Sequence, residues 1–214
     1  MPERRYTAGV TPTRIFLIRH ALVEPSARLV MYGSMDVAVC AVAMAEDAAT
    51  YRWLADRLPQ EARWFHTPLS RTRATAEAIF AAGHPPRSME MEPRFVEQHL
   101  GEWQGLTHEQ FTTMLRDPPH PFWPHGADET PPGGESLRDV MERRVGPALE
   151  DLVAQYPGED LVVVAHGGSI RAAVAHALQL DPHQALRLSV RNLSLTRLEN
   201  HGGEWRVNSI NEEP

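Results

Sequence analysis

Two Arg and two His residues stand where strands of a parallel sheet are expected to end. Arg19-His20 follows the apolar run 15–18, and His166 follows the apolar run 161–164. Arg71 lies shortly after a third short strand candidate. An arginine fork binds phosphate oxygens through two parallel hydrogen bonds, and a neutral imidazole can act as a nucleophile. These residue types together indicate phosphoryl-transfer chemistry.

The residues around these side chains favour an anionic substrate as well. Gly167 and Gly168 directly follow His166, and they would let the backbone approach a ligand closely while freeing a helix N-terminus for an anion. Phosphoryl transfer also needs a carboxylic acid that protonates the leaving oxygen and later deprotonates a water, and the chain contains candidates.

The elements that must position these side chains follow from hydrophobic periodicity. The sequence predicts strands over 15–18, 63–66, 161–164, 193–198 and 205–210, and helices over 41–58, 67–83, 135–157 and 167–178. In the helix over 67–83, Thr67 is the expected N-cap and Pro68 takes the first helical position. Strands that alternate with helices predict a three-layer α/β/α sandwich around a mostly parallel sheet. In such a sheet, ligands bind beyond the carboxyl ends of the strands.

A proline-rich segment interrupts this alternation over residues 107–134. Proline breaks helices and cannot donate to a sheet, so we expect an irregular, lid-like excursion with one helical turn near 108–115. Phe122 and Trp123 in this segment, and Tyr32 in the earlier stretch 24–37, are candidates for a substrate pocket, or else for a small core of the excursion itself. We expect a flexible N-terminal arm over 1–13 and a single domain over 14–214.

Composition excludes several other classes of protein. The formal net charge of −7 argues against binding to nucleic acids or anionic membranes. No apolar run reaches the length of a membrane span, and the first ten residues lack the apolar stretch of a secretory signal. Cys40 is the single cysteine, so no internal disulfide can form. We therefore expect a cytoplasmic protein, and the sequence leaves open whether it forms a homodimer.

Five blocks of the sequence resemble the signature of the histidine phosphatase superfamily, which includes the cofactor-dependent phosphoglycerate mutases. The resemblance extends from about residue 14 to 200, nearly the whole chain. Arg-His alone would be weak evidence, whereas five blocks in the proper order and spacing are a strong signal. The blocks are 16–20 (FLIRH), 67–77 (TPLSRTRATAE), 97–106 (EQHLGEWQGL), 132–137 (PGGESL) and 164–171 (VAHGGSIR).

This resemblance implies a phosphoglycerate mutase-like fold and a role for each matched residue. His20 would attack phosphorus and carry the phosphoryl group as a phosphohistidine. Arg19, Arg71 and His166 would hold the phosphoryl oxygens, together with the backbone at Gly167. The family needs no metal and no organic cofactor, and no metal-ligand spacing stands out in the sequence.

Glu97 would serve as the general acid and then as the base for water, although Glu102 lies close enough in sequence to compete for that role. The chain also departs from the common pattern just after the nucleophile. Ser26 keeps a hydroxyl that could still contact phosphate, whereas Val23 has no donor. The departures are Ala21, Val23, Ser26, Ser34 and Ala43.

The resemblance leaves several reactions open. The leading interpretation is a phosphomonoesterase acting on a small phosphorylated metabolite. A phosphoglycerate mutase is the runner-up, because Gln98 stands where an Arg would help to bind the substrate carboxylate and residues 24–35 lack the matching polar pattern. An α-ribazole phosphatase is suggested weakly by residues 24–37. A non-catalytic phospho-ligand-binding module is a further alternative, because fold alone does not define function.

Overall fold

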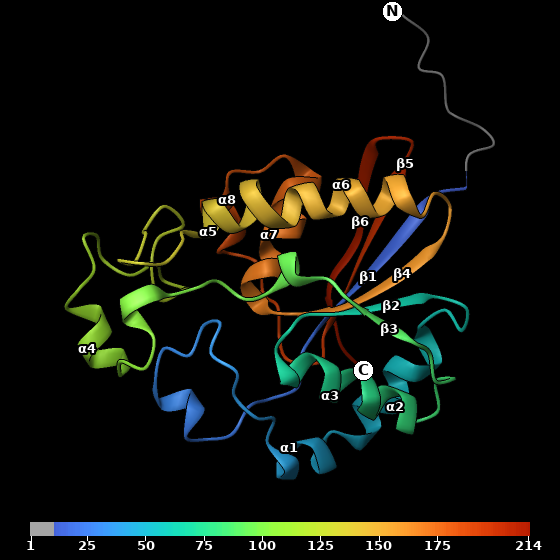
Figure 1. Cartoon of the computed structure of the whole chain (residues 1–214), viewed down its shortest axis with the longest axis horizontal. Coiled ribbons are helices and arrows are strands. Elements are labelled where there is room, and N and C mark those ends of the chain that lie inside the picture. Colours follow the sequence, from blue (N-terminus) through green and yellow to red (C-terminus); the bar gives the residue numbers. More distant parts are fainter. Residues whose placement is uncertain (1–10) are drawn as a thin grey trace, which may run out of the picture.

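A six-stranded sheet forms the centre of the computed structural model, which describes residues 11–214 (Figure 1). Its strand order is β3-β2-β4-β1-β5-β6, with the first four strands parallel and the last two antiparallel. The strands are β1 (Thr13–Arg19), β2 (Arg63–His66), β3 (Met89–Met91), β4 (Asp160–Ala165), β5 (Leu195–His201) and β6 (Glu204–Glu212). The mostly parallel sheet is confirmed, and β3, a short edge strand, is an addition.

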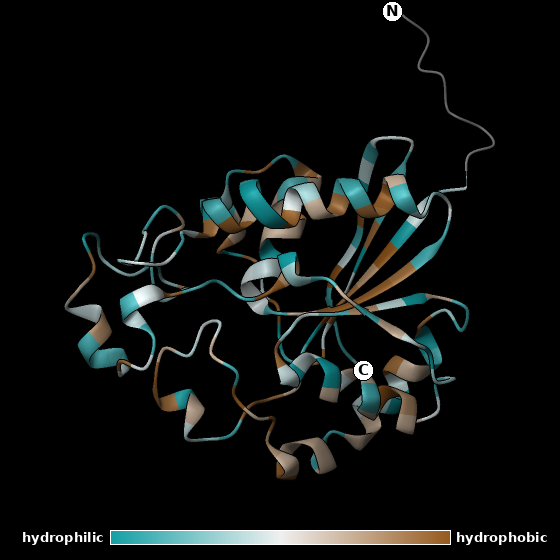
Figure 2. Cartoon of the chain, in the orientation of Figure 1, coloured by the Kyte–Doolittle hydropathy of each residue, from teal (hydrophilic) through white to brown (hydrophobic). Residues whose placement is uncertain are grey.

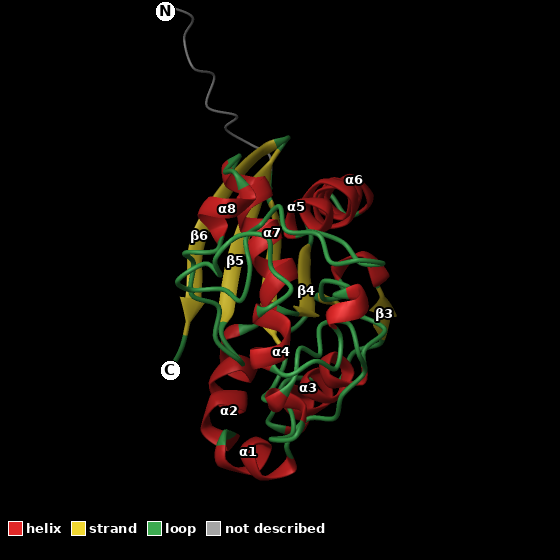
Figure 3. Ribbon diagram, turned by 90° about the vertical axis from the view of Figure 1, so that its left-hand side faces the viewer, coloured by secondary structure: helices red, strands yellow, loops and turns green. Residues whose placement is uncertain are grey.

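Helices cover both faces of this sheet, as the view in Figure 3 shows. One face carries α1 (Ala41–Glu46), α2 (Ala48–Arg57) and α3 (Ser70–Ala81). The other carries α5 (Leu137–Asp139), a π-helical turn (Val140–Val145), α6 (Gly146–Gln155), α7 (Gly167–Leu178) and α8 (Pro182–Ala185). The three-layer α/β/α sandwich is therefore confirmed. Within residues 11–214, every helix is too short or too polar to cross a membrane.

The central strands bury alternate residues on opposite faces of the sheet. In β1, Ile15 and Leu17 join the core beneath α6 and α7, whereas Phe16 and Ile18 join the core beneath α2 and α3. Figure 2 shows brown, hydrophobic residues along these central strands. Because a one-residue slip would exchange the two faces, this packing fixes the position of Arg19 at the end of β1.

The carboxyl ends of the parallel strands line up across the sheet. In the paired register, Arg19 of β1 lies opposite Ala165 of β4, and His66 of β2 lies opposite Val164. The residues that follow these ends therefore leave the sheet at one edge. This is the arrangement that the strand predictions implied.

Two predicted helices differ in detail from the structure. The helix expected over 41–58 is broken at Asp47, where ψ is 13°, so that α1 and α2 are separate. The prediction of Thr67 as N-cap is wrong, because α3 begins at Ser70. The Ser70 backbone N–H and hydroxyl donate instead to Oδ1 of Asp36 at 2.8 and 2.7 Å. A carboxylate from a distant loop therefore caps this helix.

At the N-terminal end, β1 begins at Thr13, one residue before the expected domain boundary. The Thr13 hydroxyl donates to the carbonyl oxygen of Tyr156 at 3.0 Å and is buried. Residues 1–10 of the predicted arm lie outside the described residues.

The proline-rich excursion contains the one helical turn that the sequence predicts, α4 (His108–Thr112). Thr107 caps it in a capping box. The Thr107 hydroxyl accepts from the backbone N–H of Gln110, and the Gln110 side-chain oxygen accepts from the backbone N–H of Thr107. Beneath it, Trp103 and Phe111 pack edge to face with ring centroids 4.9 Å apart. A small hydrophobic core thus joins the excursion to the 24–35 loop. It consists of Met31, Leu100, Trp103 and Phe111.

Gly101 and Gly105 provide a matched test of how the excursion is anchored. Both have positive φ, +50° and +85°, but a Cβ at Gly101 would lie 2.1 Å from the Pro132 oxygen whereas one at Gly105 would meet nothing within 4 Å. We expect Gly105→Ala to cost about 1 kcal/mol, from backbone strain alone. Gly101→Ala adds a backbone clash and should cost about 3 kcal/mol. Urea unfolding measures both, and equal losses would contradict this packing.

Candidate active site

Two histidine rings face each other at the carboxyl edge of the sheet. His20 follows β1 and His166 follows β4, and their ring centroids lie 5.1 Å apart. His20 is 1% exposed, and both His166 and Arg71 are 0% exposed. The structure therefore brings together the residues that the strand ends predicted, in a place from which water is largely excluded.

The hydrogen bonds of His20 define its tautomer. Nδ1 lies 2.7 Å from the carbonyl oxygen of Ala21, and a carbonyl can only accept, so Nδ1 carries the proton. Nε2 then keeps its lone pair. The backbone is held on both sides, because the His20 N–H donates to the Ala165 oxygen at 3.0 Å and Asn192 Nδ2 donates to the His20 oxygen at 2.8 Å. The ring is thus held in place with its Nε2 lone pair unprotonated, as a nucleophilic histidine requires.

Electrostatics keeps both rings neutral. Burial lowers the pKa of His20 well below its usual value, and the positive charges of Arg71 and Arg19 lower it further. Burial likewise lowers the pKa of His166, followed by the effects of His20 and Arg71. An imidazole that stays unprotonated near neutral pH has a lone pair available for attack.

Arg71 reaches back from the first turn of α3 to a ring of acceptors. Its Nε donates to Nδ1 of His166 at 3.3 Å, and its two terminal nitrogens donate to the backbone oxygens of Met35 and Gly33 at 2.7 and 2.8 Å. Nε2 of His166 in turn donates to the Thr67 hydroxyl at 2.9 Å. These contacts use three of the five N–H groups of Arg71 and leave two for a ligand.

Arg19 carries the clearest sign of an anion site. Its Nη1 donates to the Val190 oxygen at 2.6 Å, but its Nε is buried and has no hydrogen-bond partner among residues 11–214. Gly167 allows the close packing here, since a Cβ would lie 3.4 Å from the Arg19 guanidinium carbon and 3.2 Å from Nη1 of Arg171. A buried donor left unpaired is costly, and an anionic oxygen would satisfy it.

Glu97 lies against the N-terminus of α7. Its carboxylate accepts from the backbone N–H of Gly168 at 3.2 Å and from that of Gln98 at 3.0 Å. A Cβ at Gly168 would lie 2.3 Å from Glu97 Oε1, so the glycine is required for this approach. The competing carboxylate, Glu102, is exposed on a short 3-10 turn and does not line the cavity. Of the two carboxylates, Glu97 is therefore the one that lies at the cavity.

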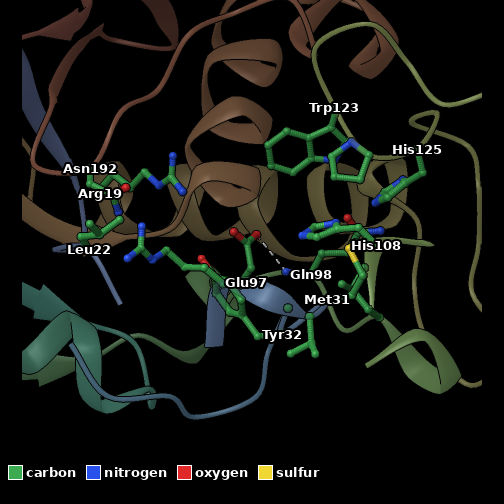
Figure 4. Close-up of a pocket in the computed structure, with 15 residues that line it drawn as sticks. Arg19, Leu22, Met31, Tyr32, Glu97, Gln98, His108, Trp123, His125 and Asn192 are labelled. Atoms are coloured by element: carbon green, nitrogen blue, oxygen red, sulfur yellow. Dashed lines mark hydrogen bonds between the residues drawn. The ribbon is translucent and has the colours of Figure 1, made fainter. Parts of the chain in front are cut away.

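A cavity of about 310 Å³ opens beside Arg19 and Glu97. Tyr32 and Trp123 line it, as expected for substrate-pocket residues, and Figure 4 shows Glu97 between Arg19 and the side chains of the excursion. The sequence reasoning missed several lining residues, because they come from loops without periodicity. The missed polar ones are Arg28, Gln98, His108, His125 and Asn192.

Six predicted site residues do not line this cavity: His20, Arg71, His166 and Gly167, which are buried, and Ser26 and Phe122, which are exposed. Ser26 is exposed, and it precedes a 3-10 turn (Ala27–Leu29) that directs Arg28 rather than Ser26 to the cavity wall. Phe122 is 68% exposed and packs its ring near His120, with centroids 5.8 Å apart. The expectations for Ser26 and Phe122 are therefore not met. Among the described residues, no group of three or more His, Cys, Asp or Glu side chains could hold a metal ion.

A comparison with protein families agrees with this geometry. The model of the histidine phosphatase superfamily (branch 1) matches residues 15–213. Since the match covers nearly the whole chain, the protein belongs to this superfamily.

Two curated proteins and one solved structure show which members of the superfamily this chain is similar to. Glucosyl-3-phosphoglycerate phosphatase of Mycolicibacterium vanbaalenii is 33% identical over 174 residues, which cover 78% of this chain and 75% of that protein. A bifunctional protein of Mycobacterium tuberculosis is 31% identical over 94% of this chain, which spans only 54% of that relative's length. The native structure of a mycobacterial glucosyl-3-phosphoglycerate phosphatase has a TM-score of 0.78 at 29% identity, over 94% of this chain and 99% of that one.

The buried histidine pair predicts how stability depends on pH. Each ring has a folded-state pKa below its unfolded value of about 6.5, so below that pH the unfolded chain binds protons that the folded chain does not. Stability should therefore fall with pH below about 6.5, by up to about 1.4 kcal/mol per pH unit for each ring. Urea unfolding between pH 7 and 5 should show a shallower slope for His20→Asn than for wild type. Parallel slopes would mean that His20 titrates normally in the folded state.

Proposed function

We propose that this chain is a phosphatase that hydrolyses a small phosphorylated metabolite through a phosphohistidine on His20. One observation carries the proposal: a neutral, buried His20 with a free Nε2 lone pair lies near the buried Arg71 and the half-buried Arg19, and the buried Nε of Arg19 lacks a partner among residues 11–214. A phosphoryl group completes this site, because it is both the electrophile for the lone pair and the anion for the guanidinium groups.

In the first step, Arg19 and Arg71 hold the phosphoryl oxygens while Nε2 of His20 attacks phosphorus, and His166 positions Arg71 by accepting from its Nε. A P–N bond forms and the ester P–O bond breaks, with Glu97 giving its proton to the leaving oxygen. The backbone N–H groups of Gly168 and Gln98 stabilise the carboxylate that remains.

In the second step, Glu97 takes a proton from water as the water oxygen attacks phosphorus. The P–N bond breaks, its electron pair returns to Nε2 of His20, and inorganic phosphate leaves. These side chains supply every group that the two steps need, so the proposal includes no metal and no organic cofactor.

Hydrolysis is favoured over a mutase reaction by the position of Gln98. This side chain is uncharged and 2% exposed, and its Nε2 donates to the Glu135 backbone oxygen at 2.7 Å. It therefore serves the fold rather than a substrate carboxylate. The similarity to glucosyl-3-phosphoglycerate phosphatases over most of their length also supports a phosphatase. We place its substrate among small phosphomonoesters and its activity in the cytoplasm.

Hydrolysis of p-nitrophenyl phosphate tests the nucleophile. We expect His20→Ala to lose all measurable turnover, since no other described side chain presents a free imidazole lone pair beside Arg19 and Arg71. The wild-type protein must be active on this ester or on a panel of phosphometabolites. Inactivity of folded wild type on all of them would overturn the phosphatase assignment.

The role of Glu97 needs a separate measurement. Glu97→Gln should lower kcat about 100-fold to 10,000-fold, because the amide can neither give nor take the proton. Inhibition by vanadate, which reports binding of the phosphoryl group, should change much less. Glu102→Gln is the matched control and should keep wild-type kcat. Equal losses of turnover and vanadate binding in Glu97→Gln would show that Glu97 is not the proton donor.

A further inference from the structure

The cavity has a second end, away from the phosphate-binding residues. Figure 4 shows Trp123, His125 and His108 on the side of the cavity opposite Arg19 and Asn192. Because the phosphoryl group belongs beside Arg19, this second end faces whatever the phosphate is esterified to. The residues that line this end therefore indicate which kind of leaving group the cavity binds.

His125 is a buried polar side chain without a complete set of partners. It is 1% exposed, and Nδ1 lies 2.8 Å from the Gly126 carbonyl oxygen, so Nδ1 carries the proton and Nε2 is an acceptor. Burial lowers its pKa, which keeps the ring neutral. Among residues 11–214, the ring makes its one hydrogen bond through Nδ1, and no N–H or O–H group donates to Nε2. Its ring neighbours are aromatic, with centroids of Trp103, Phe111 and Trp123 at 5.6, 6.3 and 6.4 Å.

Trp123 is held in place by a contact with Arg171. The guanidinium of Arg171 lies 4.3 Å from the centroid of its ring, a cation–π contact. Arg171 is itself fixed, since its Nη1 and Nε donate to the backbone oxygens of Gly167 and Leu188, each at 3.0 Å. The face of the indole therefore presents a rigid apolar surface, while its buried Nε1–H has no hydrogen-bond partner among residues 11–214.

The rest of this end is mainly apolar, formed by Met31, Leu100 and Pro124. Apart from Arg19 and Glu97 at the phosphate end, Arg28 is the one lining residue with a fixed charge. Such a wall suits an apolar ring better than a polyanion.

We propose that the leaving group of the substrate has a flat apolar body, which packs against Trp123, and a hydrogen-bond donor, which reaches Nε2 of His125. The substrate class is then a phosphomonoester of an aromatic or similarly flat alcohol that carries a hydroxyl or N–H group. This inference rests on the proposed function, since that function places the phosphoryl group at Arg19.

Phosphonates test the pocket without chemistry, because their P–C bond is not hydrolysed. Calorimetry would compare methylphosphonate, benzylphosphonate and the three hydroxybenzylphosphonates on the full chain. We expect at least one hydroxylated isomer to bind wild type about fivefold to tenfold more tightly than benzylphosphonate, from one added hydrogen bond. His125→Phe should abolish that preference, while His201→Phe, on β5 outside the cavity, should keep it. Binding of methylphosphonate should be the same in all three proteins.

The Trp123 wall is tested with the same ligands. Trp123→Ala should weaken benzylphosphonate about tenfold and leave methylphosphonate unchanged. Trp53→Ala is the matched control, because Trp53 also stacks with an arginine, Arg57 at 4.6 Å, but lies outside the cavity.

Wild type that binds benzylphosphonate no better than methylphosphonate, or shows no preference for a hydroxylated isomer, would overturn the inference. So would a preference that survives in His125→Phe. If wild type hydrolyses p-nitrophenyl phosphate in either case, the phosphatase assignment still stands. If it hydrolyses no phosphomonoester but the phosphonate preferences hold, the proposed function fails while the description of the pocket remains.

Discussion

The candidate active site, at the carboxyl edge of the sheet, depends on positive charge that is buried beside neutral histidines. Arg71 is fully buried, and Glu97, a negative charge at the same site, already accepts from two backbone N–H groups. A buried guanidinium is costly unless hydrogen bonds and opposite charge compensate it. Backbone oxygens of Gly33 and Met35 supply part of that compensation to Arg71, and the Val190 oxygen does the same for Arg19; an anionic phosphoryl group would supply the rest. The same positive charges lower the pKa of His20 and so preserve its lone pair.

The remaining architecture holds this arrangement in place. Strands β1 and β4 are buried on both faces, which sets the register that carries Arg19 and His166 to one edge. Glycines at the start of α7 let Arg19 and Glu97 approach the helix end closely, where any Cβ at Gly168 would collide with the carboxylate. The excursion then closes the cavity from the far side with Trp123 and His125. Rigid strands thus position the reacting groups, while loops shape the part of the cavity that meets the leaving group.

The parts of the molecule that could be predicted are those with local signals. Apolar runs marked β1 and β4, and the residues at their ends identified His20 and His166. The N-cap of α3 could not be predicted, because Asp36 reaches it from a distant loop and Thr67 bonds to His166 instead. His125 was missed for a similar reason, since a proline-rich segment has no periodicity that shows which side chains point inward. Ser26 and Phe122 were misplaced because sequence proximity to a site does not determine which way a loop turns.

The central claim is that the phosphoryl group passes through His20, and trapping the intermediate tests it most directly. Wild type would be mixed with a phosphomonoester, quenched in alkali and digested, and the modified peptide identified by mass spectrometry. A phosphohistidine has a P–N bond, which acid cleaves readily and alkali does not. The account predicts a phosphate on His20 that is stable to alkali, labile to acid and absent in His20→Ala. A phosphate on another residue, or turnover without any trapped phosphoenzyme, would contradict it.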